Sequence, residues 1–260
     1  MRQFNILLKK ELRDSWRSFK FIWIPLVFLM LGVSDPLVNY FMDDIMTSVG
    51  NMPDGFSITM PEMFAPDLLL ASTGQFQMIG VIVLIAAYIG TFSRERANGT
   101  ATLLYVRPIS FTALFFSKWA VASLVAVISA LVGYAGSMYY TAILYGTVEV
   151  GSFLAMCGTY CMWLLLVMAI TVAMSAALKT SIAAALAIVL IPLGSIIDGL
   201  IGSFWTVTPW KLAGYGIALL TDSVDLADYW WTLGVTVTFM VAFMIFGIVM
   251  SKKQASSVKV

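Results

Sequence analysis

Six runs of apolar residues, interrupted by very few charges, constrain this chain more than any other feature of its sequence. They cover residues 21–37, 76–92, 114–144, 153–178, 181–201 and 230–250. A helix of about 20 apolar residues crosses a bilayer, so the first run is short unless it continues to Phe41. We therefore predict an all-α integral membrane protein with six transmembrane helices. An even number of spans places both chain ends on one side.

The composition supports a membrane protein. Hydrophobic residues make up 60% of the 260 residues and charged residues only 11%, against about 25% charged residues in soluble domains. A water-soluble fold would have too few polar side chains to cover this much apolar surface. Because no internal repeat and no polar linker divides the chain, we expect a single transmembrane domain over residues 1–260.

Nearly all basic residues lie in segments that a six-span topology places on the same side of the membrane. All of the 15 Lys and Arg residues except Lys211 fall in the first 20 residues, in 94–118, at Lys179 or in the C-terminal tail. In a six-span topology these segments share one side, and short loops rich in Lys and Arg stay in the cytoplasm. We expect a multi-pass protein of the cell membrane with the N-terminus and the C-terminus in the cytoplasm.

Residues 1–20 predict an amphipathic helix before the first span. At about 100° per residue, one half of the helical wheel is apolar and the other half is basic. The apolar half contains Phe4, Leu7, Leu8, Leu12, Trp16 and Phe19. The basic half contains Arg2, Lys9, Lys10, Arg13, Arg17 and Lys20. A helix with this pattern lies in the plane of anionic headgroups, so we expect an interfacial helix with the lipid membrane as its partner.

Glu11 lies inside the apolar half of that helix, where a carboxylate needs a partner or a path to water. One interpretation is a snorkelling or locally paired side chain. The other is a contact with Arg94 or Arg96 in the segment after the second span.

Several kinds of chemistry are excluded by missing residues. The chain contains no histidine, which excludes histidine-dependent zinc sites and Ser-His or Cys-His nucleophile pairs. Cys157 and Cys161 lie in an apolar run and are expected to be structural. No P-loop sequence and no basic nucleic-acid-binding tract occurs. We expect no catalytic residue, no metal, no cofactor bound by this chain and no nucleic-acid partner.

The segments on the side opposite the basic residues are acidic. Residues 38–73 contain no Lys or Arg and form a predicted outer loop. Residues 198–228 begin too apolar for a solvated loop, which predicts an external re-entrant segment of short helices before the last span. Asp35 and Asp198 are the acids nearest the membrane interior and are possible pathway residues, although both lie close enough to an interface to reach water.

The segment 94–118 is the charged connection between the second and third spans, and we expect it in the cytoplasm. Gly99 can end the helix that leaves the second span. Pro108 blocks continuation of any helix that follows, and Ser110 can cap the third span.

Between these boundaries, the residues from Thr100 onward can form about two helical turns that present Leu103 and Leu104. With Arg107 at its rim, such a short helix would fit a groove of a separate soluble protein. The alternative is a plain amphipathic connector.

These residues resemble the family of type-2 ATP-binding-cassette (ABC) transporter permeases. The family pattern is an acid, a Gly-Thr pair, a Leu pair, a Pro-aliphatic-Ser triplet, and a Lys that opens the third span. The matching residues here are Glu95, Gly99-Thr100, Leu103-Leu104, Pro108-Ile109-Ser110 and Lys118. Lys10-Glu11-Leu12 is similar to the elbow helix of the family. Ala101 and Phe111 depart from the pattern, which affects the assignment to a subfamily.

The resemblance implies the permease subunit of an ATP-driven exporter of bacterial origin. It implies that two permeases pair, either two copies of this chain or this chain and a sister, and that two copies of an ABC ATPase subunit bind ATP and magnesium. The residues that the resemblance assigns to ATPase coupling are Glu95, Gly99, Thr100, Leu103, Leu104, Arg107, Pro108 and Lys179. The same resemblance assigns Lys10, Glu11 and Trp16 to the interfacial elbow helix.

The nearly charge-free spans favour an amphipathic or lipid-like cargo, such as a peptide, an antibiotic or a lipid, over an ion. Two alternatives stay open: a stand-alone membrane sensor or immunity protein, and a channel that works without an ATPase. Neither alternative explains the segment from Gly99 to Pro108.

Overall fold

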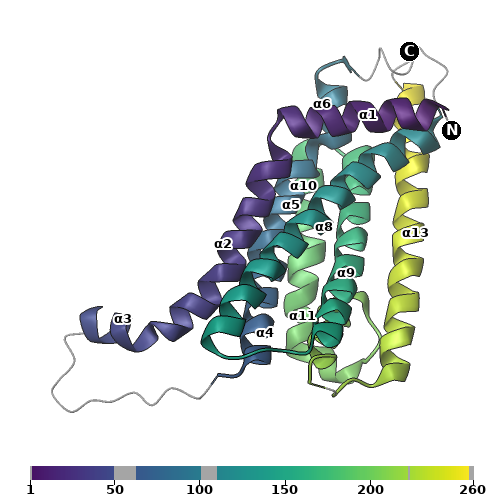
Figure 1. Ribbon diagram of the computed structural model, residues 1–260. Coiled ribbons are helices and arrows are strands. Elements are labelled where there is room, and N and C mark those ends of the chain that lie inside the picture. The colour runs from purple at the N-terminus through teal and green to yellow at the C-terminus, as the bar shows by residue number, and fades with distance from the viewer. Residues whose placement is uncertain (1, 50–62, 101–109, 222, 258–260) are drawn as a thin grey trace.

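The chain folds into a bundle of helices that are long enough to span a membrane. The computed structural model describes residues 2–49, 63–100, 110–221 and 223–257. Within these residues, six helical stretches are long and apolar enough to cross a bilayer, which confirms the six predicted spans. They run side by side, and both chain ends lie at the same end of the bundle (Figure 1).

The first two spans and their neighbours form the N-terminal part of the bundle. Its helices are α1 (Arg2–Arg17), α2 (Lys20–Tyr40), α3 (Met42–Val49), α4 (Ala65–Gln75), the π-helix η1 (Phe76–Gly80), α5 (Val81–Tyr88) and α6 (Gly90–Ala97). Together, α4, η1, α5 and α6 make the second span. α3 extends away from the bundle (Figure 1).

The remaining four spans follow. The helices are α8 (Phe111–Leu144), α9 (Val150–Ala177), α10 (Thr180–Ile188), the π-helix η2 (Val189–Leu193), α11 (Gly194–Ile201), the 3-10 helices η3 (Gly202–Phe204) and η4 (Pro209–Lys211), α12 (Leu212–Ala218) and α13 (Leu226–Ser257). α10, η2, α11 and η3 together make the fifth span. α9 is the central helix, because it packs against α5, α6, α8, α10, α12 and α13.

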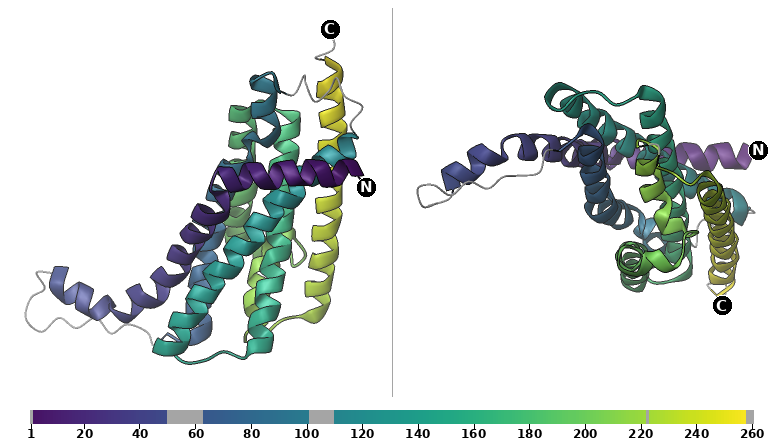
Figure 2. Two further views of the ribbon diagram at one scale, coloured as in Figure 1. Left: turned by 45° about the horizontal axis from the view of Figure 1, so that its top comes forward. Right: turned by 90° about the horizontal axis from the view of Figure 1, so that it is seen from below.

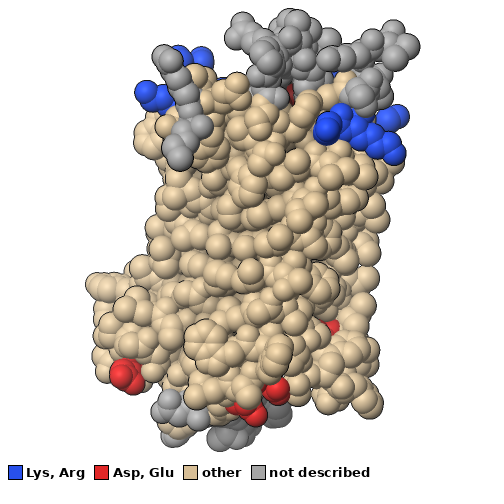
Figure 3. Space-filling view, turned by 90° about the vertical axis from the view of Figure 1, so that its right-hand side faces the viewer, with Lys and Arg blue, Asp and Glu red and all other residues tan. Residues whose placement is uncertain are grey.

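The two ends of the bundle differ in charge. On the face shown in Figure 3, Lys and Arg gather at the end that carries the chain termini, and Asp and Glu gather at the opposite end. We call these the basic end and the acidic end. The separation agrees with the distribution of basic residues along the sequence.

The second span starts earlier than its apolar pattern predicts. The sequence places its start at residue 76 and leaves the preceding residues in the acidic outer loop, but the helix begins at Ala65. Pro66 occupies the first turn, and the Asp67 carboxylate accepts a hydrogen bond from the Phe64 N–H at 2.9 Å. Leu68 and Leu69 are fully buried. These capping groups and this burial outweigh the polar residues that suggested a loop.

Small residues let α2 and α8 approach closely. A Cβ atom at Gly32 would lie 2.2 Å from the carbonyl oxygen of Gly133, and one at Gly133 would lie 2.9 Å from that of Phe28. The two helix backbones are therefore in direct contact, as at other membrane helix interfaces built on glycine.

After α11 the chain turns back toward the middle of the bundle. Trp210 donates a hydrogen bond from its indole N–H to the Ile191 carbonyl oxygen at 3.2 Å, and its ring lies 6.2 Å from that of Trp163 in α9. α12 then packs on α9 with Leu212 buried. These contacts fold the segment back against α9, and its re-entry into the membrane stays a prediction.

Candidate functional site

α1 lies across the basic end, crosswise to the spans (Figures 1 and 2). Leu7, Glu11 and Ser15 are buried, and their spacing of four residues places them on the face that meets the bundle. Trp16, next to this face, is 64% exposed. At the corner into α2, Phe19 adopts a left-handed backbone conformation with φ of 56°, which is uncommon for a bulky residue. This corner ends α1 and turns the chain into the first span.

A network of four charged side chains connects α1, α6 and α8. The Lys118 ammonium of α8 lies 2.8 Å from Glu11 Oε1 of α1 and 2.9 Å from Glu95 Oε1 of α6. The Lys10 ammonium lies 2.7 Å from the same oxygen of Glu95 and 3.0 Å from that of Glu11. Two cations thus bridge two carboxylates from helices that are far apart in the sequence.

The network is largely shielded from solvent, although the Lys10 side chain is 38% exposed. The Lys118 side chain is 1% exposed, and those of Glu11 and Glu95 are 11% and 21% exposed. Burial by itself raises the pKa of Glu11, but Lys118 and Lys10 outweigh burial and hold it below its ordinary value. Burial likewise lowers the pKa of Lys10, and the carboxylates of Glu11 and Glu95 raise it by more. Both groups therefore stay charged near neutral pH.

The helix of the second span is interrupted between α5 and α6, and side chains from other elements bind the freed backbone groups. Lys20 donates to the Ala87 carbonyl oxygen at 2.7 Å, and Lys118 donates to that of Thr91 at 3.3 Å. The Ser175 hydroxyl of α9 accepts a hydrogen bond from the Phe92 N–H at 2.9 Å. Because buried backbone groups need partners, these contacts stabilise the break and fix the direction of α6.

Arg96 of α6 forms hydrogen bonds with the end of α9. Its guanidinium donates to the carbonyl oxygens of Ala176 and Ser175, each at 2.8 Å, and to that of Leu178. These carbonyls lie at the end of α9, where a helix leaves acceptors unpaired and favours a cation. Lys179 follows directly and is exposed.

The structure places the residues predicted for ATPase coupling as follows. Glu95 belongs to the buried network, so its contact is with α1 and α8. Gly99 has a φ of 70°, which favours glycine, and the Thr100 hydroxyl donates to the Glu95 carbonyl oxygen at 3.1 Å. Leu103, Leu104, Arg107 and Pro108 lie outside the described residues. Ser110 caps α8 as predicted, since its hydroxyl accepts from the Ala113 N–H at 3.4 Å.

The suggested contact of Glu11 with Arg94 or Arg96 is wrong. Glu11 pairs with Lys118 and Lys10 instead. Arg96 is directed to the end of α9. The helical wheel shows that Glu11 faces the bundle but does not show which helix lies opposite.

Asp35 and Asp198, the possible pathway residues, lie in two separate places. Asp35 of α2 accepts a hydrogen bond from the Gln75 amide at 2.6 Å, and its second oxygen is buried without a partner among the described residues. Asp198 of α11 accepts from Trp205 at 2.8 Å and from Thr208 at 3.2 Å, and lies 3.7 Å from the Lys211 ammonium. Asp198 thus ties together the segment that folds back after α11.

The sequence pattern does not show that Lys20, Arg96 and Ser175 bind backbone groups of the second span and of α9. One signal was available for Lys118. A Lys inside an apolar run and a Glu inside an apolar helix face each need an opposite charge, so Lys118 and Glu11 could have been paired from their environments.

The described residues show no arrangement typical of a metal centre. They contain no group of three or more Cys, Asp or Glu side chains placed to hold a metal ion. Cys157 is buried and Cys161 is half-buried, and both thiols are free. The charged and hydrogen-bonded contacts at the basic end join α1, α6, α8 and α9.

Six apolar spans with an interrupted second helix, braced at its end, define a multi-pass helical membrane protein. A family model described as "ABC-2 family transporter protein" matches residues 5–229. The chain therefore belongs to the ABC-2 transporter family and is a transporter membrane domain, in agreement with the resemblance seen in its sequence.

A curated relative is also a membrane protein. The "Uncharacterized transmembrane protein YxlG" of Bacillus subtilis (strain 168) is 29% identical to this chain over 167 residues. The alignment covers 64% of this chain and 65% of the relative, slightly less than two thirds of its length.

Proposed function

We propose that this chain is the permease subunit of an ATP-driven exporter in which α6 and residues 98–110 carry motion from a separate ATPase into the spans. The observation that supports this most is the bracing of α6 on two sides. Glu95 connects it to α1 and α8 through buried ion pairs, and Arg96 connects it to α9. A helix held in this way transmits a push to its neighbours as a rigid body.

The partner docks at the basic end, which faces the cytoplasm in this proposal because Lys and Arg gather there. Leu103 and Leu104 anchor the short coupling helix in a groove of the ATPase, with Arg107 and Lys179 at the margin. Two ATPase subunits bind ATP and magnesium, while this chain binds neither. The proposed location is a bacterial cell membrane.

A second permease, identical or a sister chain, completes the transporter. The fifth and sixth spans support this pairing, since only 17% of the most apolar stretch of each is buried within the chain. Their apolar surfaces also suit an amphipathic or lipid-like cargo. Of the two possible pathway residues, Asp35 is favoured, because one of its oxygens lacks a partner in the described chain whereas Asp198 has three.

Co-purification with the candidate ATPase tests the proposal. The double variant Leu103→Asp/Leu104→Asp should release the ATPase and abolish the ATP hydrolysis that the permease stimulates, because charged side chains cannot fill an apolar groove. Ile6→Asp is the matched control, since Ile6 is an apolar residue of α1 that is 63% exposed at the same end of the bundle. Equal retention of the ATPase by the double variant would refute the coupling helix. Failure of the wild type to bind any ATPase would favour a sensor or a channel.

A further inference from the structure

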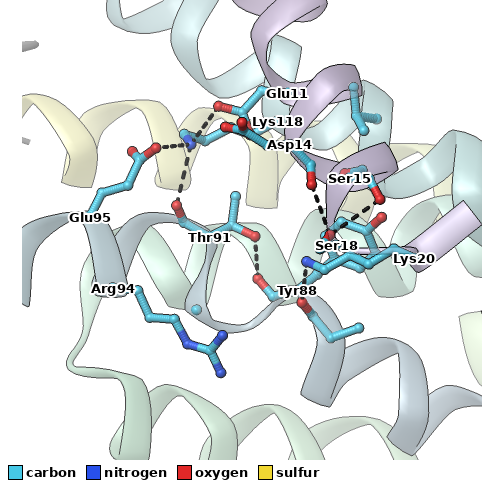
Figure 4. A pocket seen from close by; sticks show the side chains of 13 residues that line it. Glu11, Asp14, Ser15, Ser18, Lys20, Tyr88, Thr91, Arg94, Glu95 and Lys118 are labelled. Carbon is cyan, nitrogen blue, oxygen red and sulfur yellow. Dashed lines mark hydrogen bonds and ion pairs between the residues drawn. The ribbon is translucent and has the colours of Figure 1, made fainter. Parts of the chain in front are cut away.

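A pocket of about 320 Å³ lies beside the charged network at the basic end. It is enclosed by α1, the first residue of α2, the interruption between α5 and α6, and α8 (Figure 4). Its walls include Lys20, Tyr88, Arg94 and the carboxylates of Glu11 and Glu95. All of these walls are formed by this one chain.

Two cations in the wall are not neutralised by carboxylates. Glu11 and Glu95 are already paired with Lys118 and Lys10. Neither Lys20 nor Arg94 forms an ion pair within the described part of the chain. Lys20 donates to a backbone carbonyl and lies 4.2 Å above the Tyr88 ring, neither of which removes its charge. The acid Asp14 lies at the margin with its side chain 58% exposed, 3.9 Å from Lys10.

Arg94 lines this pocket, and its side chain packs against a glycine one turn earlier. A Cβ atom at Gly90 would lie 2.5 Å from Arg94 Nε and 2.6 Å from Arg94 Cδ. The Arg94 side chain therefore lies flat against the backbone of α6. Any larger residue at position 90 would force it to another rotamer.

Tyr88 adds an unused polar group to the wall. Its side chain is 3% exposed. Its hydroxyl lies near Ser15 but makes no hydrogen bond of good geometry with the described residues. Buried hydroxyls of this kind normally have a partner, so a ligand oxygen in the pocket would supply one.

The pocket lies at the depth where the apolar spans begin. Lys20 is the first residue of the first span. On the corner before it, Trp16 and Phe19 are 64% and 65% exposed. Beyond it, Ile22 of α2 is 54% exposed and offers an apolar surface for an acyl chain. Exposed aromatic and aliphatic residues next to Lys and Arg are typical of the headgroup region.

We propose that this pocket binds the phosphate of an anionic phospholipid, with Lys20 and Arg94 as its cationic ligands and the Tyr88 hydroxyl as a further donor. Charge-assisted hydrogen bonds from Lys and Arg to phosphate oxygens are strong. A lipid at this position would bridge the α1 corner and α6, and would join the interfacial helix to the segment that follows the second span.

Native mass spectrometry of the detergent-solubilised full chain tests the site with dioleoyl phosphatidylglycerol and dioleoyl phosphatidylcholine at equal concentrations. The wild type should retain the anionic lipid in preference. Lys20→Gln/Arg94→Gln should weaken this binding about tenfold or more, as expected for losing about 1.4 kcal/mol. Gly90→Ala should weaken it in the same direction while preserving every charge. Arg13→Gln/Arg17→Gln, which removes two exposed charges of α1, should leave binding unchanged.

Three results would overturn the proposal. An equal loss of lipid binding in Arg13→Gln/Arg17→Gln would mean that binding depends on the overall charge of the protein and not on the pocket. Unchanged binding in Gly90→Ala and in Lys20→Gln/Arg94→Gln, with both variants eluting as folded protein, would place the lipid elsewhere. Displacement of the lipid by an equal concentration of glycerol 3-phosphate would assign the pocket to a soluble phosphate ester.

Discussion

At the scale of single residues, Lys118 has the largest expected effect on stability. Among the described residues, it is the one cation between α1, α6 and α8 whose side chain is almost fully buried. A buried ion pair contributes little net stability when intact, since desolvation offsets the attraction. Removing one partner is different, because it leaves an uncompensated charge in a medium of low polarity.

Lys118→Met is therefore expected to lower the free energy of unfolding by about 3–5 kcal/mol, because Glu11 and Glu95 would then share only Lys10 and one carboxylate charge would be left uncompensated. Thermal unfolding in detergent measures the effect. Lys9→Met on α1 is the control, since this exposed Lys makes no ion pair among the described residues. Partial recovery in Glu11→Gln/Lys118→Met would identify the unpaired charge as the cause. A loss no larger than that of Lys9→Met would contradict this account.

At the scale of helices, the contact between α2 and α8 depends on close approach of their backbones. No atom of a side chain separates Gly32 from the Gly133 carbonyl. Lipid tails are as apolar as leucine, so helices associate in a membrane mainly through such packing. The contact holds α2, and with it the α1 corner, in place against α8.

Gly133→Ala should destabilise the bundle by about 1–3 kcal/mol, because the added methyl group overlaps the Phe28 carbonyl oxygen and the Phe76 ring. Gly158→Ala in α9 is the matched control: nothing lies within 4 Å of its added methyl group, and the change should be neutral or slightly stabilising, since Ala has the higher helix propensity. Apparent unfolding temperatures of both variants in detergent compare them. Equal stability would show that α2 and α8 can separate at no cost.

At the scale of the whole molecule, the separation of charge between the two ends predicts its orientation. Short segments rich in Lys and Arg are retained on the cytoplasmic side, and the described parts of these segments lie at the end that holds both termini. We therefore expect the acidic end to face the outside of the cell.

Cysteine labelling tests this orientation in a background with Cys157→Ala and Cys161→Ala. Ser223→Cys at the acidic end should react with a membrane-impermeant maleimide on intact cells. Lys252→Cys, near the end of α13, should react only after the membrane is permeabilised. Both positions are exposed, so access is not limited by burial. The reverse pattern would invert the topology and remove the proposed ATPase site from the cytoplasm.

The sequence by itself determined the fold class, the six spans and the separation of charge. These properties are local. The hydropathy of a span depends only on its own residues, and Lys and Arg in a short loop favour the cytoplasmic side for that loop. Ser110 could be assigned as a cap for the same reason. The start of the second span could not be predicted from the sequence, because the burial of Leu68 and Leu69 against other helices outweighed the turn-forming residues around them.

Only the tertiary structure decided which side chains meet. Glu11 faces the bundle in any helical wheel, but its partner Lys118 is 107 positions away, and its placement depends on how α1 crosses α8. The same holds for Arg96 on the end of α9 and for the pocket beside Lys20. The segment containing Leu103 and Leu104 stays a prediction. The packing of whole helices decides which distant residues come into contact. The spacing of residues along the sequence predicts which way a side chain points, but not which residue lies opposite it.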